Sequence, residues 1–411
     1  ANSVQNWVSK LGFECLQSLD SECIGSKDVC VIIDESIRLG NERMLLVLLS
    51  PASCASTDFR CLTYADVKVG YVGWRHSWTG DAIQGIVSQL LSDTDLNLSY
   101  VISDAANNLT RTARLLNVPH VADVSHAIGC CLRKTFKACP NYKAFSKLLG
   151  TYQCKGVHQS LSYLVPPKQR KKARFMNQKK IVDWSTNLLA KWDTLTAKEQ
   201  TFFEELPTHR PIISALATCL DIAKTIASVL KKQGLDATTM PSLQQELTKV
   251  RQQISADKPM DSHVSSFLGY FDDYIAGYKY FVDKYLTNIS KDKDKYLSNT
   301  PQDKDKQLSN TPQDKDKQLL NIPQGHAVYA CSDIIESMFG TYKSKVSTNP
   351  LVAASKMGLE LPALCLTPKE TQARIKTSLE GVYLVSLKKW IKAQSNENQH
   401  IKRIKFNKKV A

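Results

Sequence analysis

Two short apolar runs, each ending in an aspartate, constrain the fold of this chain more than any other feature. VCVIID ends at Asp34 and LSYVISD ends at Asp104. Runs of this length that are rich in β-branched residues predict buried strands. A polar stretch with a glycine, ESIRLGNE, follows the first acid and predicts a turn there. We therefore expect both aspartates at the ends of strands.

The segments around these runs predict the order of the other elements. Apolar periodicity gives two more antiparallel strands over 43–51 and 61–74, a helix over 80–93, and, after the second run, a helix over 105–117 and a strand over 118–123. Three strands, a helix, a strand, a helix and a strand is the order of the ribonuclease H fold, whose sheet places the first and fourth strands side by side. We expect an α/β protein with a ribonuclease-H-like mixed five-stranded sheet flanked by helices, in which Asp34 and Asp104 are neighbours.

The following part of the chain changes character, because strand-like runs give way to long amphipathic stretches. This predicts a large all-α insertion that interrupts the α/β domain. The expected division of the chain is the tail of a truncated N-terminal helix-turn-helix region at 1–25, the first part of a catalytic core at 26–135, the all-α insertion at 136–290, a low-complexity repeat at 291–324, the second part of the core at 325–385 and a basic C-terminal tail at 386–411.

The helix-turn-helix expectation comes from the opening segment, SVQNWVSKLGF. It reads as the end of a recognition helix followed by a glycine turn, with Trp7 and Val8 packed inward. An ordinary amphipathic N-terminal helix is the alternative. Because the chain begins with Ala rather than Met, we expect that a segment upstream is missing.

An eleven-residue unit, of the form DKDKQLSNTPQ, recurs almost unchanged over 291–324. Each unit carries only one or two leucines among charged and polar residues, so stacked units would bury too little apolar surface to form a solenoid. We predict a mobile surface loop, with a short helical extension as the alternative.

A third acid is expected in the stretch after the repeat, HAVYACSDIIESMFGTYKSKV. Its apolar residues have helical spacing and predict a helix that packs on the sheet, which places Glu336 at the sheet edge. Asp333 lies three residues earlier on a similar face, so spacing alone leaves both acids open. The apolar residues of this face are Ile334, Ile335, Met338 and Phe339.

Together Asp34, Asp104 and Glu336 would suit two hard cations about 4 Å apart, because Mg²⁺ or Mn²⁺ prefers oxygen ligands. One ion would activate a water or a DNA 3′-hydroxyl, and the other would stabilise the leaving 3′-oxygen. Taken alone, each acid is more often a turn, cap or solvated residue. The combination of two strand-end acids, a helical insertion and a helical glutamate favours the metal site.

The amino-acid composition indicates the kind of binding partner and the cellular compartment. The chain has 54 Lys and Arg against 39 Asp and Glu, a net charge of +15, which favours binding to a polyanion and makes DNA the first candidate. Its 12 cysteines are scattered without a CxxC pair, which is typical of a reducing compartment rather than a disulfide framework or a zinc site. No apolar run approaches the roughly 18 residues that a membrane span needs.

At this point the chain resembles the DDE transposases, in particular the broad group that includes the hAT and Mutator-like families, of bacterial insertion-sequence type. Members carry a helical insertion before their glutamate and, after the second aspartate, a Cys or Asp followed two residues later by His. VADVSHAI supplies Asp123 and His126 at that place. The resemblance covers about 28–346 and rests on short motifs.

The resemblance implies metal-dependent cleavage at transposon ends, strand transfer into double-stranded target DNA, and a homo-oligomer that is at least a dimer when two ends are joined. His126 would contact the scissile phosphate or shape the metal site, unless it only caps its own helix. A location in the cytoplasm, at the bacterial nucleoid, is also implied. A ribonuclease-H-like nuclease without strand transfer and an inactive DNA-binding descendant are the competing functions.

Additional DNA contacts are expected from aromatic and basic clusters. Trp78 could instead be a packing residue, and Asn107 and Asn108 could orient a metal-bound water or cap a helix. The basic C-terminal tail would follow phosphates or serve solubility. The expected DNA-binding residues are Arg75, His76 and Trp78 beside the first strands, and Arg170, Lys171, Lys172 and Arg174 in the basic segment at 166–180.

Overall fold

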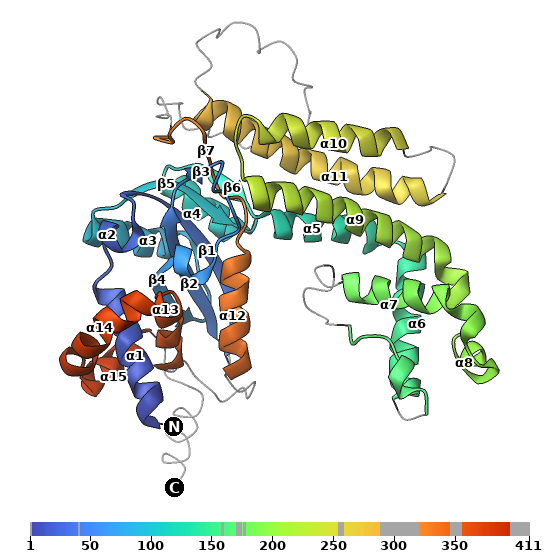
Figure 1. Ribbon diagram of the computed structural model, residues 1–411, viewed down its shortest axis with the longest axis horizontal. Helices are drawn as coiled ribbons and strands as arrows, with labels where there is room; N and C mark the ends of the chain where they lie inside the picture. Colours follow the sequence, from blue (N-terminus) through green and yellow to red (C-terminus); the bar gives the residue numbers. More distant parts are fainter. Residues whose placement is uncertain are drawn as a thin grey trace, which may run out of the picture.

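A mixed five-stranded sheet lies at the centre of the protein (Figure 1). The computed structural model describes residues 2–39, 42–157, 160–169, 175, 178–253, 259–287, 320–345 and 356–394. The order across the sheet is β4-β2-β1-β5-β6, with β1 antiparallel to β2, β2 antiparallel to β4, and β1, β5 and β6 parallel. These strands are β1 (Asp28–Leu39), β2 (Glu42–Pro51), β4 (Lys68–Arg75), β5 (Asn97–Ser103) and β6 (His120–Ala122).

The predicted α/β class and the mixed five-stranded sheet are confirmed, but two strand limits were wrong. β1 does not stop at Asp34, because its pairing with β2 continues through the expected turn to Leu39. Asp34 therefore lies inside a strand. β4 begins at Lys68 rather than at residue 61, since Tyr64–Asp66 forms a 3₁₀ turn that Thr63 and Asp66 cap reciprocally.

Helices cover both faces of the sheet, which explains why its central strands read as continuous apolar runs. The residues from Val29 to Ile33 and from Met44 to Leu49 are 0% exposed. α3 (Gly80–Thr94) and α4 (Asn107–Leu115) pack on one face, and the Thr79 hydroxyl caps α3. The opposite face packs against α12 (Asp333–Lys345), whose predicted apolar face is buried.

From α5 to residue 287 the described part of the chain is helical, apart from turns, short connections and one isolated bridge. α5, α9, α10 and α11 lie together beside the β6 side of the sheet, and α6, α7 and α8 lie farther from it (Figure 1). The helices are α5 (Val124–Phe136), α6 (Pro140–Gly156), α7 (Gln178–Ala190), α8 (Ala197–Phe202), α9 (Arg210–Gln233), α10 (Thr239–Gln253) and α11 (Pro259–Phe281).

One helical stretch, Leu206–Gln233, is long and apolar enough to cross a membrane by length and composition. Its apolar side is buried in this protein, where α9 contacts α5, α7, α10 and α11. Asp221 and Lys224 lie on its exposed side. This is the pattern of an amphipathic helix packed on a protein core. The helix ends at Gly234, whose φ is 71°.

Most of the eleven-residue repeat, 291–319, lies outside the described residues, and so does the tail from 395 onward. After the repeat, β7 (His326–Ala327) pairs with β3 (Cys54–Ala55) and leads into α12.

The N-terminal helix packs against the C-terminal helices rather than ending in a glycine turn. α1 (Asn2–Gln17) runs straight through Gly12, where a Cβ atom would lie 1.6 Å from the Leu359 carbonyl oxygen. Glycine is needed there for close approach of the two backbones. Trp7 is 51% exposed, so the expectation that it packs inward was also wrong. The C-terminal partners of α1 are α13 (Glu360–Leu364), α14 (Pro368–Gly381) and α15 (Leu384–Gln394).

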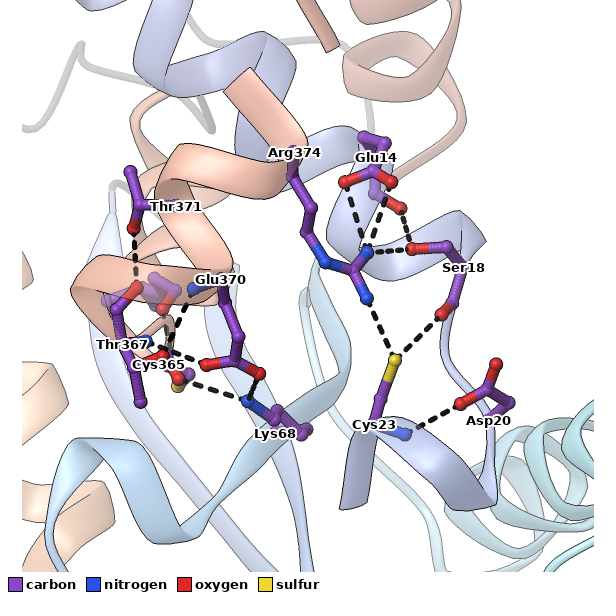
Figure 2. Close-up of polar contacts among 11 residues, drawn as sticks. Glu14, Ser18, Asp20, Cys23, Lys68, Cys365, Thr367, Glu370, Thr371 and Arg374 are labelled. Atoms are coloured by element: carbon purple, nitrogen blue, oxygen red, sulfur yellow. Dashed lines mark hydrogen bonds and ion pairs between the residues drawn. The ribbon is translucent and has the colours of Figure 1, made fainter. Parts of the chain in front are cut away.

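Two ion pairs join these helices to each other and to the sheet (Figure 2). Arg374 of α14 pairs with Glu14 of α1 at 3.1 Å and also donates to the Cys23 sulfur. Lys68, at the start of β4, pairs with Glu370 at 2.6 Å. The two ends of the chain are therefore held together at the edge strand.

We expect Glu370→Gln to lower the free energy of unfolding by about 1 kcal/mol at pH 7. Burial alone would raise the pKa of Glu370, but hydrogen bonds from Lys68 and Thr367 outweigh it and hold that pKa below its usual value. The ionised carboxylate therefore adds stability above its unfolded-state pKa, and this is lost as the pH falls through the lower folded-state pKa. Denaturant unfolding at pH 7 and pH 3.5 should show a smaller acid-induced loss in the variant. Glu246→Gln, in an exposed pair with Lys249, is the matched control.

Candidate metal centre

Asp34 and Asp104 are adjacent because β1 and β5 are parallel neighbours. The ladder between these strands ends at the pair Ile33 and Ser103, and each aspartate is the next residue. Asp104 is fixed by a hydrogen bond in which its Oδ1 accepts the Ala106 N–H at 2.9 Å. Its side chain is 25% exposed, so this edge of the sheet is open to solvent.

The Asp34 carboxyl lies in the most unfavourable electrostatic position of the three acids. Burial raises its pKa, and the carboxylates of Asp104 and Glu336 raise it further, to about 8. A backbone hydrogen bond and the nearby His126 act in the opposite direction but do not compensate. A positive charge would therefore stabilise the ionised form of this half-buried carboxyl.

α12 brings Glu336 to the same place and directs Asp333 elsewhere. Ile335 and Met338 anchor the helix with 0% exposure, and Glu336 stands on its open side. The protein around Glu336 and the negative charges of Asp123 and Asp333 raise the pKa of its carboxyl. Asp333 instead pairs with Lys231 of α9 and accepts the Ser125 hydroxyl at 2.7 Å.

The pairing of Asp333 has an electrostatic consequence that separates it from Glu336. Although burial acts against ionisation, Lys231 and Ser125 lower the pKa of Asp333. Its negative charge is therefore neutralised within the protein, whereas that of Glu336 is not.

The three acids do not converge on a single point. Within the described part of the chain, they form no group whose ligand oxygens all lie within 4.8 Å of one another. Asp123, Cys331 and Asp333 do form such a group. There, however, both Asp123 oxygens accept backbone N–H groups and Asp333 is paired with Lys231, so these ligands are already engaged.

Asp123 has a structural position that the sequence did not reveal. It is 2% exposed and caps α5, where its Oδ2 accepts the His126 N–H at 2.8 Å. Its Oδ1 accepts the Ser332 N–H, also at 2.8 Å, just before α12. One carboxylate thus joins the start of the helix that carries His126 to the start of the helix that carries Glu336.

His126 faces the aspartate pair, with its Nε2 3.8 Å from Asp104 Oδ2. Its hydrogen bond with Cys130, together with the carboxylates of Asp104 and Asp123, raises the pKa of the imidazole to about 9 despite partial burial. The same contact lowers the pKa of the Cys130 thiol. The arrangement therefore favours an imidazolium beside the acids.

Trp78 is buried, which corrects the expectation that it contacts DNA. The indole is 4% exposed, donates to the Arg43 carbonyl at 2.9 Å and packs edge-on against Tyr71, so it is a packing residue in this structure. Asn108 donates to Glu35 at 2.8 Å and to the Trp78 carbonyl at 3.2 Å, and so neither caps α4 nor points to the acids. Asn107 is the exposed first residue of α4.

The other expected DNA contacts divide into exposed and undescribed residues. Arg75 and His76 are exposed at the end of β4, and the Arg75 guanidinium lies 4.8 Å from the centre of the Trp78 ring. The remaining residues lie outside the described part of the chain, and they are Arg170, Lys171, Lys172 and Arg174.

Sequence reasoning missed two residues around the acids. Cys130 follows His126 by four residues, so helical spacing could have placed them on one face. Lys231 had no local signal, because it meets Asp333 across 102 residues of sequence.

The comparisons with known proteins add no family. The sequence matches no protein-family model and has no significant match among curated proteins.

Proposed function

We propose that this protein is a DNA transposase with a ribonuclease-H-like core, which cleaves phosphodiester bonds and joins DNA strands at Asp34, Asp104 and Glu336. The observation that carries the proposal is the half-buried Asp34 carboxyl, whose pKa is raised to about 8 by burial and by the carboxylates of Asp104 and Glu336. Such a cluster is costly without a cation, and oxygen ligands of this kind suit Mg²⁺ or Mn²⁺.

The effect of both other carboxylates on the pKa of Asp34 supports a two-ion site in which Asp34 is the common ligand. Asp34 would be shared, with Asp104 completing one ion site and Glu336 the other. This division agrees with the finding that the three sets of oxygens do not meet within 4.8 Å. Two ions would supply activation of the attacking oxygen and stabilisation of the leaving 3′-oxygen.

His126 would bind the substrate rather than a metal ion. An imidazolium next to Asp104 would be repelled by a cation on that carboxylate, but it can donate a hydrogen bond to a phosphate oxygen. The raised pKa of His126, about 9, keeps its proton at neutral pH. We therefore assign it to the scissile phosphate.

Two further features favour a transposase over a simple nuclease. The helical segment of 136–290 would be an insertion placed between the second and third acids, as in the families that the sequence resembles. The net charge of +15 suits a protein that holds DNA ends and a target together. Joining two ends implies at least a dimer, and in a bacterial cell the enzyme would act at the nucleoid.

The proposal is tested by incubating the full chain with a supercoiled plasmid and a labelled duplex that ends in a free 3′-hydroxyl. Mg²⁺ or Mn²⁺ should support nicking and insertion of the labelled strand into the plasmid, and EDTA should abolish both. Nicking without insertion would assign the protein as a nuclease. The absence of both nicking and insertion, on plasmid DNA and on duplexes that carry any inverted repeats flanking the gene, would overturn the proposal.

A further inference from the structure

A basic stripe runs along α5 away from the acid cluster. Positions separated by three, four, seven or eleven residues share one side of a helix. On α5 and its C-cap this side carries no apolar residue, and its members are solvent-exposed or half-buried, whereas Ala127, Cys131 and Phe136 on the other side are buried. The stripe consists of His126, Cys130, Arg133, Lys134 and Lys137.

The stripe begins at the candidate metal centre and ends well outside it. His126 lies 3.8 Å from Asp104, which fixes the inner end. At 1.5 Å of rise per residue, Arg133 is about 10 Å and Lys137 about 16 Å farther along the axis. In B-DNA that distance corresponds to about five base-pair steps of 3.4 Å each.

We propose that this face of α5 binds the phosphate backbone of the DNA duplex that flanks the scissile phosphate, through Arg133, Lys134 and Lys137. The inference rests on the proposed function, which places His126, at the inner end of the stripe, on the cleaved strand. The rest of the stripe would hold the uncut duplex. α5 suits this role because it leads from the sheet to α6 alongside α9 (Figure 1).

The neighbours of the stripe leave its positive charge largely intact. The Lys134 ammonium lies 5.3 Å from the centre of the Tyr270 ring on α11, a contact that preserves its charge. Arg133 donates to the Cys130 sulfur at 3.7 Å. Asp273 of α11 is an acid whose charge reaches this part of α5, as its effect on Cys131 shows. The three cations Arg133, Lys134 and Lys137 outnumber it.

Helix stabilisation is the competing explanation. Cations in the last turn interact favourably with the helix dipole, and Arg133 and Lys134 lie in that turn. A purely stabilising role predicts that loss of these cations lowers thermal stability but not DNA affinity. Measuring both properties on the same variants therefore distinguishes the two explanations.

The test measures binding of a fluorescent 30-base-pair duplex in EDTA, where cleavage cannot contribute. The triple variant Arg133→Ala, Lys134→Ala, Lys137→Ala should bind at least tenfold more weakly at 50 mM salt. The slope of log affinity against log salt should become shallower by about 2.7, or 0.9 for each lost phosphate contact. Circular dichroism at the assay temperature verifies that the variant is folded.

The matched control removes three exposed lysines of α6, Lys143, Lys147 and Lys155, and so makes the same change in net charge. It should alter the salt slope by less than one. Equal losses in both triple variants, or a lower melting temperature with unchanged affinity in the α5 variant, would overturn the proposal. Binding is measured without metal, so it does not depend on whether the protein cleaves DNA. Failure of the proposed catalytic function can therefore be distinguished from failure of the proposed binding surface.

Discussion

Asp34→Asn is expected to reduce metal-dependent DNA cleavage and joining by roughly 10³-fold or more. The loss follows from removing the carboxylate that both ions would share, and such ions contribute several kcal/mol to transition-state stabilisation. Single-turnover nicking of a supercoiled plasmid in Mg²⁺, with the metal-free reaction subtracted, measures the effect. Cleavage by the variant at the wild-type rate would remove Asp34 from the site.

The same variant should be more stable than the wild type when no metal is present. A carboxyl whose folded-state pKa is raised by burial and by two other carboxylates destabilises the folded protein above its unfolded-state pKa, and a neutral amide removes this cost. About 1–2 kcal/mol is the usual scale for such site changes. Mg²⁺ should raise the melting temperature of the wild type but not that of the variant, because only the wild type gains bound ions.

The two acids of α12 supply the matched controls for this experiment. Glu336→Gln should behave like Asp34→Asn, with the metal-induced stabilisation reduced. Asp333→Asn should retain it, because the Asp333 carboxylate is already neutralised by Lys231. The opposite result would make Asp333 the third metal ligand.

Asp123→Ala is expected to lower the free energy of unfolding by about 3 kcal/mol. The change removes the side-chain cap of α5 and a second charge-assisted hydrogen bond to Ser332, and it leaves both N–H groups without their acceptor in a buried position. Cleavage should also fall, because α5 and α12 position His126 and Glu336. Guanidinium unfolding and the plasmid assay measure the two effects.

Asp20→Ala is the control that measures the contribution of a helix cap alone to the free energy of unfolding. Asp20 caps α2 (Ser21–Ile24) by accepting the Cys23 N–H at 2.7 Å, but it is exposed and joins no second element. Its loss should cost about 1 kcal/mol or less. A large fall in cleavage by Asp123→Ala at unchanged stability would instead give Asp123 a direct role in the chemistry.

The sequence alone determined the sheet and the neighbourhood of its two aspartates. Strand and helix periodicity depends on residues close in the chain, and the order of elements then admitted few topologies. The predicted adjacency of the strands of Asp34 and Asp104 followed from that order, and the structure pairs them in parallel. The limit of β1 was missed because ESIRLGNE has the composition of a turn, while pairing with β2 extends the strand to Leu39.

Only the tertiary structure decided which polar groups are neutralised and which are not. Asp333 and Glu336 are nearly equivalent by helical spacing, but Lys231 reaches Asp333 from α9, 102 residues away. Likewise, the tie from Asp123 to Ser332 spans 209 residues, and the glycine that seemed to end α1 instead admits the Leu359 backbone. Local patterns carry no record of such contacts, because they depend on the packing of whole elements.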